Sequence, residues 1–251
     1  MNFSVSITVK QEFNRTAALA SGSTLLIAAA ALVMPAIFPL ALPQTSGATV
    51  QTFSLLVALL MLVMYAMTLI FSLFTHKHLY ASVENKAAAR ERTTGVGERW
   101  GVWQSIGVLL AATLGVAWMS SLLVGAINPI AATLGWTQLF IGVVIIAIVG
   151  NVAEHTSAIT MALKNKMDLA LQISIGSATQ VAIFVAPVLV FVSLFFAVPM
   201  TLVFDPFELV GILLSVIIVN VIVEDGESNW LEGAQLLIAY LIIAIAFFVH
   251  P

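Results

Sequence analysis

Residues 150–155 read Gly-Asn-Val-Ala-Glu-His and lie inside an apolar run that begins near Trp136. The run is long enough to cross a membrane, so it places an amide, a carboxylate and an imidazole within a span. Asn151, Glu154 and His155 are spaced i, i+3 and i+4, which a helix presents roughly on one face. A charge at this depth costs at least about 2.5 kcal/mol, so the carboxylate indicates a functional site. The alternative is a protonated Glu154 that only hydrogen-bonds a neighbouring helix.

The composition is that of a multi-pass membrane protein. Of the 251 residues, 61% are hydrophobic and 8% are charged, whereas soluble domains have about 25% charged residues. The chain has no cysteine, which excludes disulfides and thiolate metal sites. The sequence carries no motif that pairs a nucleophile with a base, so we expect no enzyme. Nothing in it indicates nucleic acid binding.

Apolar runs of spanning length recur along the chain. A spanning helix needs about 20 apolar residues. We expect seven, at 16–42, 50–74, 101–127, 136–163, 169–198, 207–223 and 231–250. Pro35, Pro39 and Pro43 are expected to end the first. The predicted fold class is therefore an all-α polytopic membrane protein with about seven transmembrane helices.

The basic residues predict how these helices are oriented. All nine Lys and Arg fall at the N-terminus (Lys10 and Arg15), in the polar segment 75–99, or in the link 164–166. With seven spans these places share one side, which the positive-inside rule assigns to the cytoplasm. We expect an integral membrane protein with a cytoplasmic N-terminus, two helices in 1–74 and a cytoplasmic loop at 75–99. The loop is either a solvated connector or a lipid-binding or regulatory contact.

Two neighbouring spans bring polar side chains to a similar depth. Glu154 lies ten residues before the basic link, about 15 Å along a helix, and so near the middle of an apolar core about 30 Å thick. On the next span, Ser177 and Gln180 lie about 14–18 Å from the link. The candidate site consists of Asn151, Glu154, Ser177 and Gln180.

Three further residues are candidates for supporting this site. Gly150 can let the helix bend or open a carbonyl group. His155 is interpreted as a hydrogen-bonded histidine that orients its neighbours, because zinc would require more imidazole or thiolate ligands. Ser174 lies on the Ser177 helix, where its small side chain fits close helix packing equally well.

Carboxylate and neutral oxygens form the ligand set of a hard cation such as Ca2+. Glu154 is the expected metal ligand. A desolvated carboxylate takes up a proton more readily than one in water, so a single Glu can hold a proton or a cation in turn. One carboxylate matches a divalent ion poorly, yet no second acidic residue is expected at this depth. The spans 16–42 and 50–74 contain none.

The sequence resembles the Ca2+/H+ (cation/proton) exchanger family, within the wider cation/Ca2+ exchanger superfamily. Segments 150–155, 164–169 and 176–180 are similar to the second of the family's two inverted α-repeats. Segments 11–18 and 225–233 are also typical of these exchangers. The resemblance implies a sodium/calcium-exchanger-like membrane domain of five helices.

The resemblance places this domain at 100–251, with the second α-repeat at 136–198. It implies that Glu154 binds Ca2+ and H+ alternately, while Asn151, Ser177 and Gln180 line the same pathway. The Ca2+ and H+ are transported ions, and no cofactor is expected.

The implied function is a Ca2+/H+ antiporter that exports cytosolic Ca2+ across a bacterial plasma membrane. The resemblance covers the family's second half, and transport in such folds takes place between two inverted repeats. Besides the bilayer, we therefore expect a partner, either another chain or a missing N-terminal half that carries the first repeat. The alternatives are a non-transporting or regulatory subunit and a Na+-coupled exchanger. The Glu154–His155 pair favours proton coupling.

Overall fold

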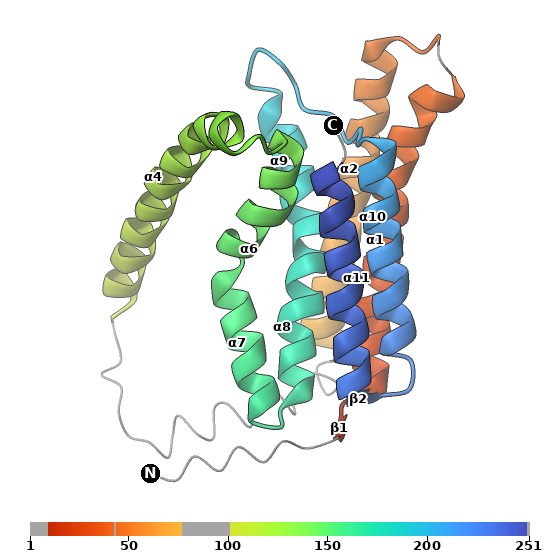
Figure 1. Ribbon diagram of the computed structural model, residues 1–251, viewed down its shortest axis with the longest axis vertical. Coiled ribbons are helices and arrows are strands. Elements are labelled where there is room, and N and C mark those ends of the chain that lie inside the picture. The colour runs from red at the N-terminus through yellow and green to blue at the C-terminus, as the bar shows by residue number, and fades with distance from the viewer. Residues whose placement is uncertain (1–9, 43, 77–100, 250–251) are drawn as a thin grey trace. The chain divides into compact units, whose positions relative to one another are not determined.

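The computed structural model describes residues 10–42, 44–76 and 101–249 (Figure 1). Apart from Thr75 and His76, the predicted loop 75–99 lies outside the described residues, as does Pro43. The chain divides into two compact units. The first takes the described parts of 1–84 and 153–240, and the second takes those of 85–152 and 241–251.

The described residues contain five helices that are long and apolar enough to span a membrane. They are α1 (Arg15–Ala41), α2 (Gly47–Ile70) with the π-helical turn η1 (Phe71–Thr75), α4 (Val102–Leu134), α8 (Met167–Gln180) continued by the π-helical turn η3 (Val181–Val185) and α9 (Ala186–Ser193), and α11 (Trp230–Val249).

Two further apolar stretches complete the set. One is a pair of helical stretches, Gln138–Gly150 and Val152–Leu163, which is bent at the break between them. The other is α10 (Pro206–Ile222), whose 17 residues are at the short end of the spanning range of about 17–25 residues. The predicted all-α, multi-pass fold class is confirmed.

Two of the three prolines expected to end the first span, Pro35 and Pro39, do not end it. Helix α1 continues through Pro35 and Pro39 and ends only at Ala41. A proline removes one backbone donor, but packing inside an apolar bundle tolerates that loss where neighbouring groups re-satisfy the freed carbonyl. Pro35 is among the buried residues of α1, which is consistent with such packing.

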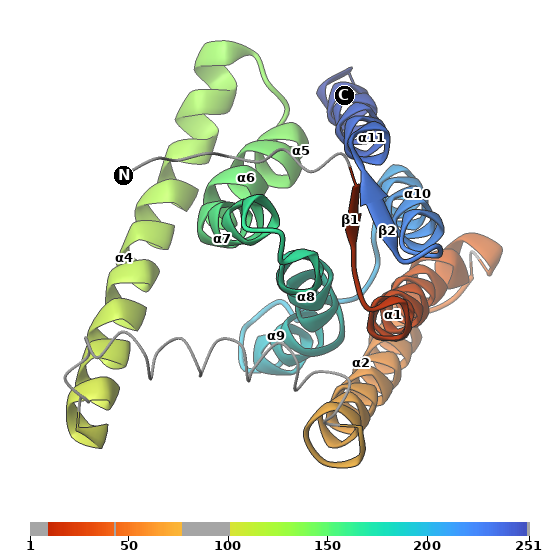
Figure 2. The ribbon, with the colours of Figure 1, turned by 90° about the horizontal axis from the view of Figure 1, so that it is seen from below.

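The first unit is organised around α1, which packs against α10, α8 and α2, while α2 packs against α9 (Figure 2). Its main core lies between α1, α2 and the η3–α9 stretch, and it includes Leu32, Met61, Ile183 and Val190. A second buried cluster lies near the start of α1. It joins Ala18, Ile175 on α8 and Val223 just after α10.

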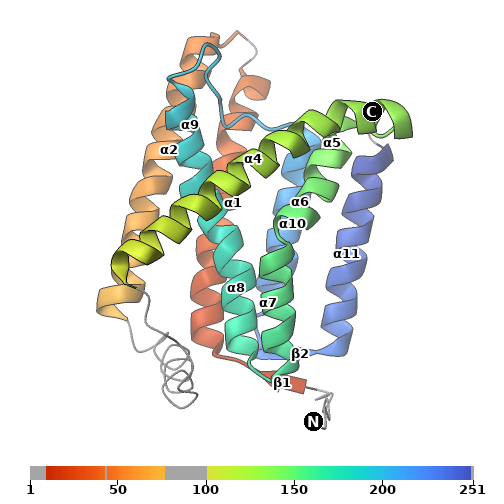
Figure 3. The same ribbon diagram turned by 90° about the vertical axis from the view of Figure 1, so that its left-hand side faces the viewer.

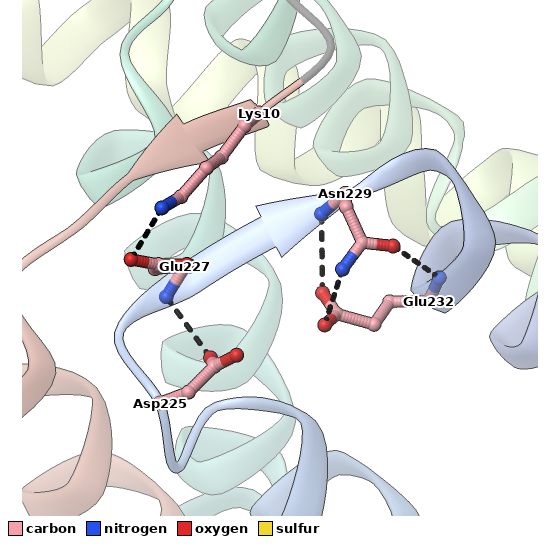
Figure 4. A network of polar contacts seen from close by, with 5 residues as sticks. All are labelled: Lys10, Asp225, Glu227, Asn229 and Glu232. Atoms are coloured by element: carbon pink, nitrogen blue, oxygen red, sulfur yellow. Dashed lines mark hydrogen bonds and ion pairs between the residues drawn. The ribbon is translucent and has the colours of Figure 1, made fainter.

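A two-stranded ribbon, which the sequence did not predict, joins distant parts of the chain. Strand β1 (Lys10–Glu12) pairs antiparallel with β2 (Glu227–Asn229), with Gln11 opposite Ser228. Lys10 Nζ lies 2.6 Å from Glu227 Oε1 (Figure 4). The Glu227 carboxylate raises the pKa of the Lys10 ammonium above its usual value.

In the second unit, α4 is one continuous helix with no buried residue among those described. It ends at Gly135, whose φ of +68° reverses the chain after the last helical turn. The following Trp136 stacks edge-on with Phe140, with ring centroids 5.4 Å apart. Phe248 meets Phe140 edge-on at 5.1 Å. These rings fix the start of the next helical stretch.

Candidate functional site

The span that carries the motif is broken at Asn151. It runs through α5 (Gln138–Phe140), the π-helical turn η2 (Ile141–Ile146) and α6 (Ala147–Gly150), and resumes as α7 (Val152–Leu163). Asn151 itself has φ −103° and ψ 16°, outside the helical region.

The Asn151 side chain bonds to the backbone at the break. Its backbone N–H donates to Ala147 O at 3.1 Å, and its Nδ2 donates to the same carbonyl oxygen at 2.9 Å. A short amide side chain that bonds its own backbone competes with continued helix. A Cβ added at Gly150 would meet nothing within 4 Å, so Gly150 provides flexibility and not clearance.

Glu154 lies in the first turn of the helix that follows the break. Its side chain is half-buried, whereas His155 is exposed. Within the described residues the Glu154 carboxylate makes no hydrogen bond or ion pair. The N-terminus of a helix carries partial positive charge, which stabilises a negative side chain there. The break therefore places Glu154 beside the N-terminal end of α7, inside an apolar span.

The second group of candidates lies on α8, which neighbours α7 as the other arm of a hairpin (Figure 3). Ser177 is half-buried and Gln180 is exposed. Ser174 donates its hydroxyl to Ala170 O of its own helix at 3.0 Å, so its hydroxyl hydrogen is already engaged. Gln180 is the last residue before η3. Single π-helical turns often occur at functional sites.

Both hairpin arms are continuous helix between the link and these residues. Glu154 is about 14 Å from the end of α7, and Ser177 is about 15 Å from the start of α8. The prediction that the two side chains lie at one depth therefore rests on regular helices. Asn151 belongs to the second unit, and the other three candidates belong to the first.

The described residues contain no group of three or more His, Asp or Glu side chains that could hold a metal ion. The set that the sequence predicts around Glu154 is a single carboxylate with amide and hydroxyl groups. Such a set can bind a proton or contribute part of a cation's oxygen shell.

Comparison with known proteins identifies the family. The family described as sodium/calcium exchanger protein matches residues 104–249, more than half of the chain. The chain is 42% identical to a Ca2+/H+ antiporter of Synechocystis over 96% of its own length and 68% of that protein's. It is 44% identical to the Ca2+/H+ antiporter ChaA of Bacillus subtilis, covering 95% of this chain and 66% of that one.

This chain belongs to the Ca2+/H+ exchanger family. The fold of the exchanger agrees with a solved relative: the structure of native YfkE is similar with a TM-score of 0.76 and 40% identity, covering 96% of this chain and 66% of that one. The exchanger thus spans about two thirds of the length of these relatives.

The structure also shows contacts for residues of segment 11–18, which the sequence analysis described only as typical of these exchangers. Gln11 donates its amide to Ala162 O at 3.0 Å, and the Asn14 backbone N–H donates to Asp168 Oδ1 at 2.6 Å. Both bonds join the N-terminal segment to the α7–α8 hairpin. In the sequence, these contacts are indicated only by the polar residues of segment 11–15. The residues that this segment contacts lie more than 150 positions away.

Two basic residues of this N-terminal segment contact the acidic segment 224–227, one through an ion pair and one through a backbone carbonyl. The acidic segment contains no basic residue of its own. In the exchanger, Lys10 pairs with Glu227, and the Arg15 guanidinium donates to Glu224 O. The order of charges along the chain does not predict these contacts, because their partners are far apart in sequence.

Proposed function

We propose that this exchanger is a Ca2+/H+ antiporter that moves Ca2+ out of the cytosol against protons. The observation that carries the proposal is the half-buried Glu154, which sits beside a helix break in an apolar span. The relatives named Ca2+/H+ antiporter, which match over nearly the whole chain, support it.

In this proposal Glu154 is the residue that alternates between cation and proton. When the carboxylate is ionised it contributes an oxygen ligand to Ca2+, and when it is protonated the divalent ion loses that charge and leaves. Asn151, Ser177 and Gln180 contribute neutral oxygens along the pathway. His155, Gly150 and Ser174 support the site through orientation, flexibility and packing.

We further propose that the other of the family's two inverted repeats, the first, completes the site. A divalent ion is better matched by two carboxylates, and exchangers of the inverted-repeat type bind substrate at a repeat interface. The relatives are longer than the region that matches this chain. The second carboxylate would come from another chain or from further sequence. We place the assembly in a bacterial plasma membrane with Lys10 and Arg15 on the cytoplasmic side.

The test is 45Ca2+ uptake into proteoliposomes under an imposed pH gradient, with wild type and Glu154→Gln compared. Glu208→Gln is the matched control, because this substitution makes the same change of charge at the start of α10. With a chain that carries the first repeat present in the same vesicles, we expect gradient-driven uptake in wild type and the control, and none in Glu154→Gln.

Three outcomes contradict parts of the proposal. Wild-type uptake in Glu154→Gln removes this residue from the mechanism. Uptake that requires Na+ and ignores the pH gradient makes the protein a Na+-coupled exchanger. No uptake by the wild type reconstituted by itself means that this chain alone does not transport, and co-reconstitution with a chain that carries a first repeat then decides between a subunit and a non-transporting protein.

A further inference from the structure

We infer that the N-terminal segment Lys10–Arg15 is a fixed anchor for α7, and that Gln11 and Asp168 are positioning residues for Glu154. The anchor's effect on transport rests on the proposed function, whereas its effect on α7 does not. The evidence is a set of contacts that join this segment to four helices of the first unit.

The first contact holds the end of α7. No residue of the described helix α7 is buried, so packing alone fixes it weakly. The Gln11 amide donates to Ala162 O, next to the last residue of α7, at 3.0 Å. Gln11 Oε1 is itself buried without a hydrogen-bond partner among the described residues. The Gln11 side chain thus lies against this end of α7, where its amide forms the hydrogen bond to Ala162 O.

The second contact holds the start of α8. Asp168 lies in the first turn of α8, and its Oδ1 accepts the backbone N–H of Asn14 at 2.6 Å. Asn14 also caps α1, because its side chain accepts the Ala17 N–H at 3.1 Å. One short loop therefore ties the beginning of α1 to both arms of the hairpin.

The opposite side of the segment is attached to the end of α10 and to the ribbon. The Phe13 N–H donates to Gly226 O at 3.0 Å, and Arg15 donates to Glu224 O. Phe13 also packs on the buried cluster of Ala18, Ile175 and Val223. Because that cluster joins α1, α8 and the end of α10, the segment is continuous with a packed platform.

The platform matters for Glu154 because α7 acts as a lever. Glu154 lies eight residues, about 12 Å, from Ala162 along the helix, so a tilt of about 5° moves the carboxylate by about 1 Å. Loosening the Ala162 end lets α7 shift and tilt, so the contact at that end limits where the carboxylate stands relative to Ser177 on the neighbouring arm.

Gln11→Leu tests the anchor with little risk to folding. Ala162 O keeps a partner, since it also accepts the Asn165 N–H at 2.9 Å, and the unpaired Gln11 oxygen is removed. The matched control is Gln51→Leu, which deletes a similar bond from Gln51 Nε2 to Met200 O at 3.3 Å. Both variants are made in the full chain and compared by hydrogen–deuterium exchange.

We expect Gln11→Leu to raise amide exchange over 152–163 by about fivefold, the effect of one typical hydrogen bond. Gln51→Leu should leave exchange over 152–163 unchanged. Asp168→Ala should act like Gln11→Leu. Asp168→Asn, which keeps a carbonyl oxygen for the Asn14 N–H, should restore wild-type exchange.

Transport supplies the second readout. In proteoliposomes we expect Gln11→Leu to raise the KM for Ca2+ by about fivefold with an unchanged maximal rate per folded protein. Wild-type exchange over 152–163 in both Gln11→Leu and Asp168→Ala would overturn the anchor. Raised exchange in a preparation whose wild type does not transport would leave the anchor standing, and the co-reconstitution described above would then decide on the proposed function. Raised exchange with a wild-type KM would overturn the positioning role.

Discussion

Gly226 occupies a backbone conformation that other residues adopt only with strain. Its φ is +83°, and a Cβ built on it would lie 3.0 Å from Arg15 Cβ. The same residue's carbonyl accepts the Phe13 N–H. Its conformation and its clearance therefore both serve the junction between the ribbon and α1.

Gly226→Ala should destabilise the fold by more than Gly135→Ala. Each change costs about 1–2 kcal/mol for a left-handed residue. At Gly135, with φ +68°, an added Cβ meets nothing within 4 Å, so this variant isolates the conformational cost. Unfolding midpoints in detergent measure both variants. Equal losses would mean that the contact with Arg15 contributes nothing.

The ion pair of Lys10 predicts that the stability of the fold depends only weakly on pH in the alkaline range. Glu227 raises the Lys10 pKa, so the ion pair's contribution is fully present below the ordinary lysine value and is lost as pH rises through the raised value. The pair is exposed and screened by solvent. We therefore expect Lys10→Gln to leave the unfolding midpoint at neutral pH unchanged. A loss as large as that of Gly226→Ala would contradict this assignment.

Between elements, α1 and α10 meet at one polar contact. Asn220 Nδ2 on α10 donates to Gly22 O at 3.1 Å and to Val216 O at 2.9 Å. A Cβ on Gly22 would lie 2.6 Å from Asn220 Oδ1. The two helices therefore approach closely at this point, where the absence of a side chain on Gly22 leaves room for Asn220.

Gly22→Ala should cost about 1–3 kcal/mol of stability, because Asn220 or the helices must shift to make room. In an Asn220→Ala background the same change should cost much less. The double-mutant cycle, read from unfolding midpoints in detergent, gives the coupling between the two positions. Additive losses would show that Gly22 is free of this contact.

The helices were predictable because a spanning run is a local property. The predicted span 16–42 became Arg15–Ala41, and 231–250 became Trp230–Val249. The ribbon was not predictable, since its strands are short, polar and far apart in sequence. For the site, the sequence placed Glu154 in mid-span and Gly150 as a point of bending. The break lies at Asn151, whose side chain bonds to Ala147 O, and spacing along the sequence does not reveal that bond.

For the whole molecule, the proposed site predicts that Ca2+ stabilises the folded state. A ligand at 100 times its Kd raises the free energy of unfolding by about 2.7 kcal/mol. We expect Ca2+ to raise the unfolding midpoint of the wild type and to lose this effect as pH falls, because protons compete for Glu154. Glu154→Gln should show no Ca2+-dependent shift. An equal shift in that variant would place Ca2+ elsewhere.

The N-terminal anchor also sets an order for assembly during translation. Asp168 is 154 residues beyond Asn14, and Glu224 is 209 residues beyond Arg15. At about 5–20 residues per second, the ribosome delivers these partners after roughly 8–30 s and 10–40 s. The nascent hairpin can therefore capture the N-terminal segment first, and β2 closes the ribbon later. The start of α1 therefore gains its partners in two stages, the first once α8 has been made and the second once α10 and β2 have been made.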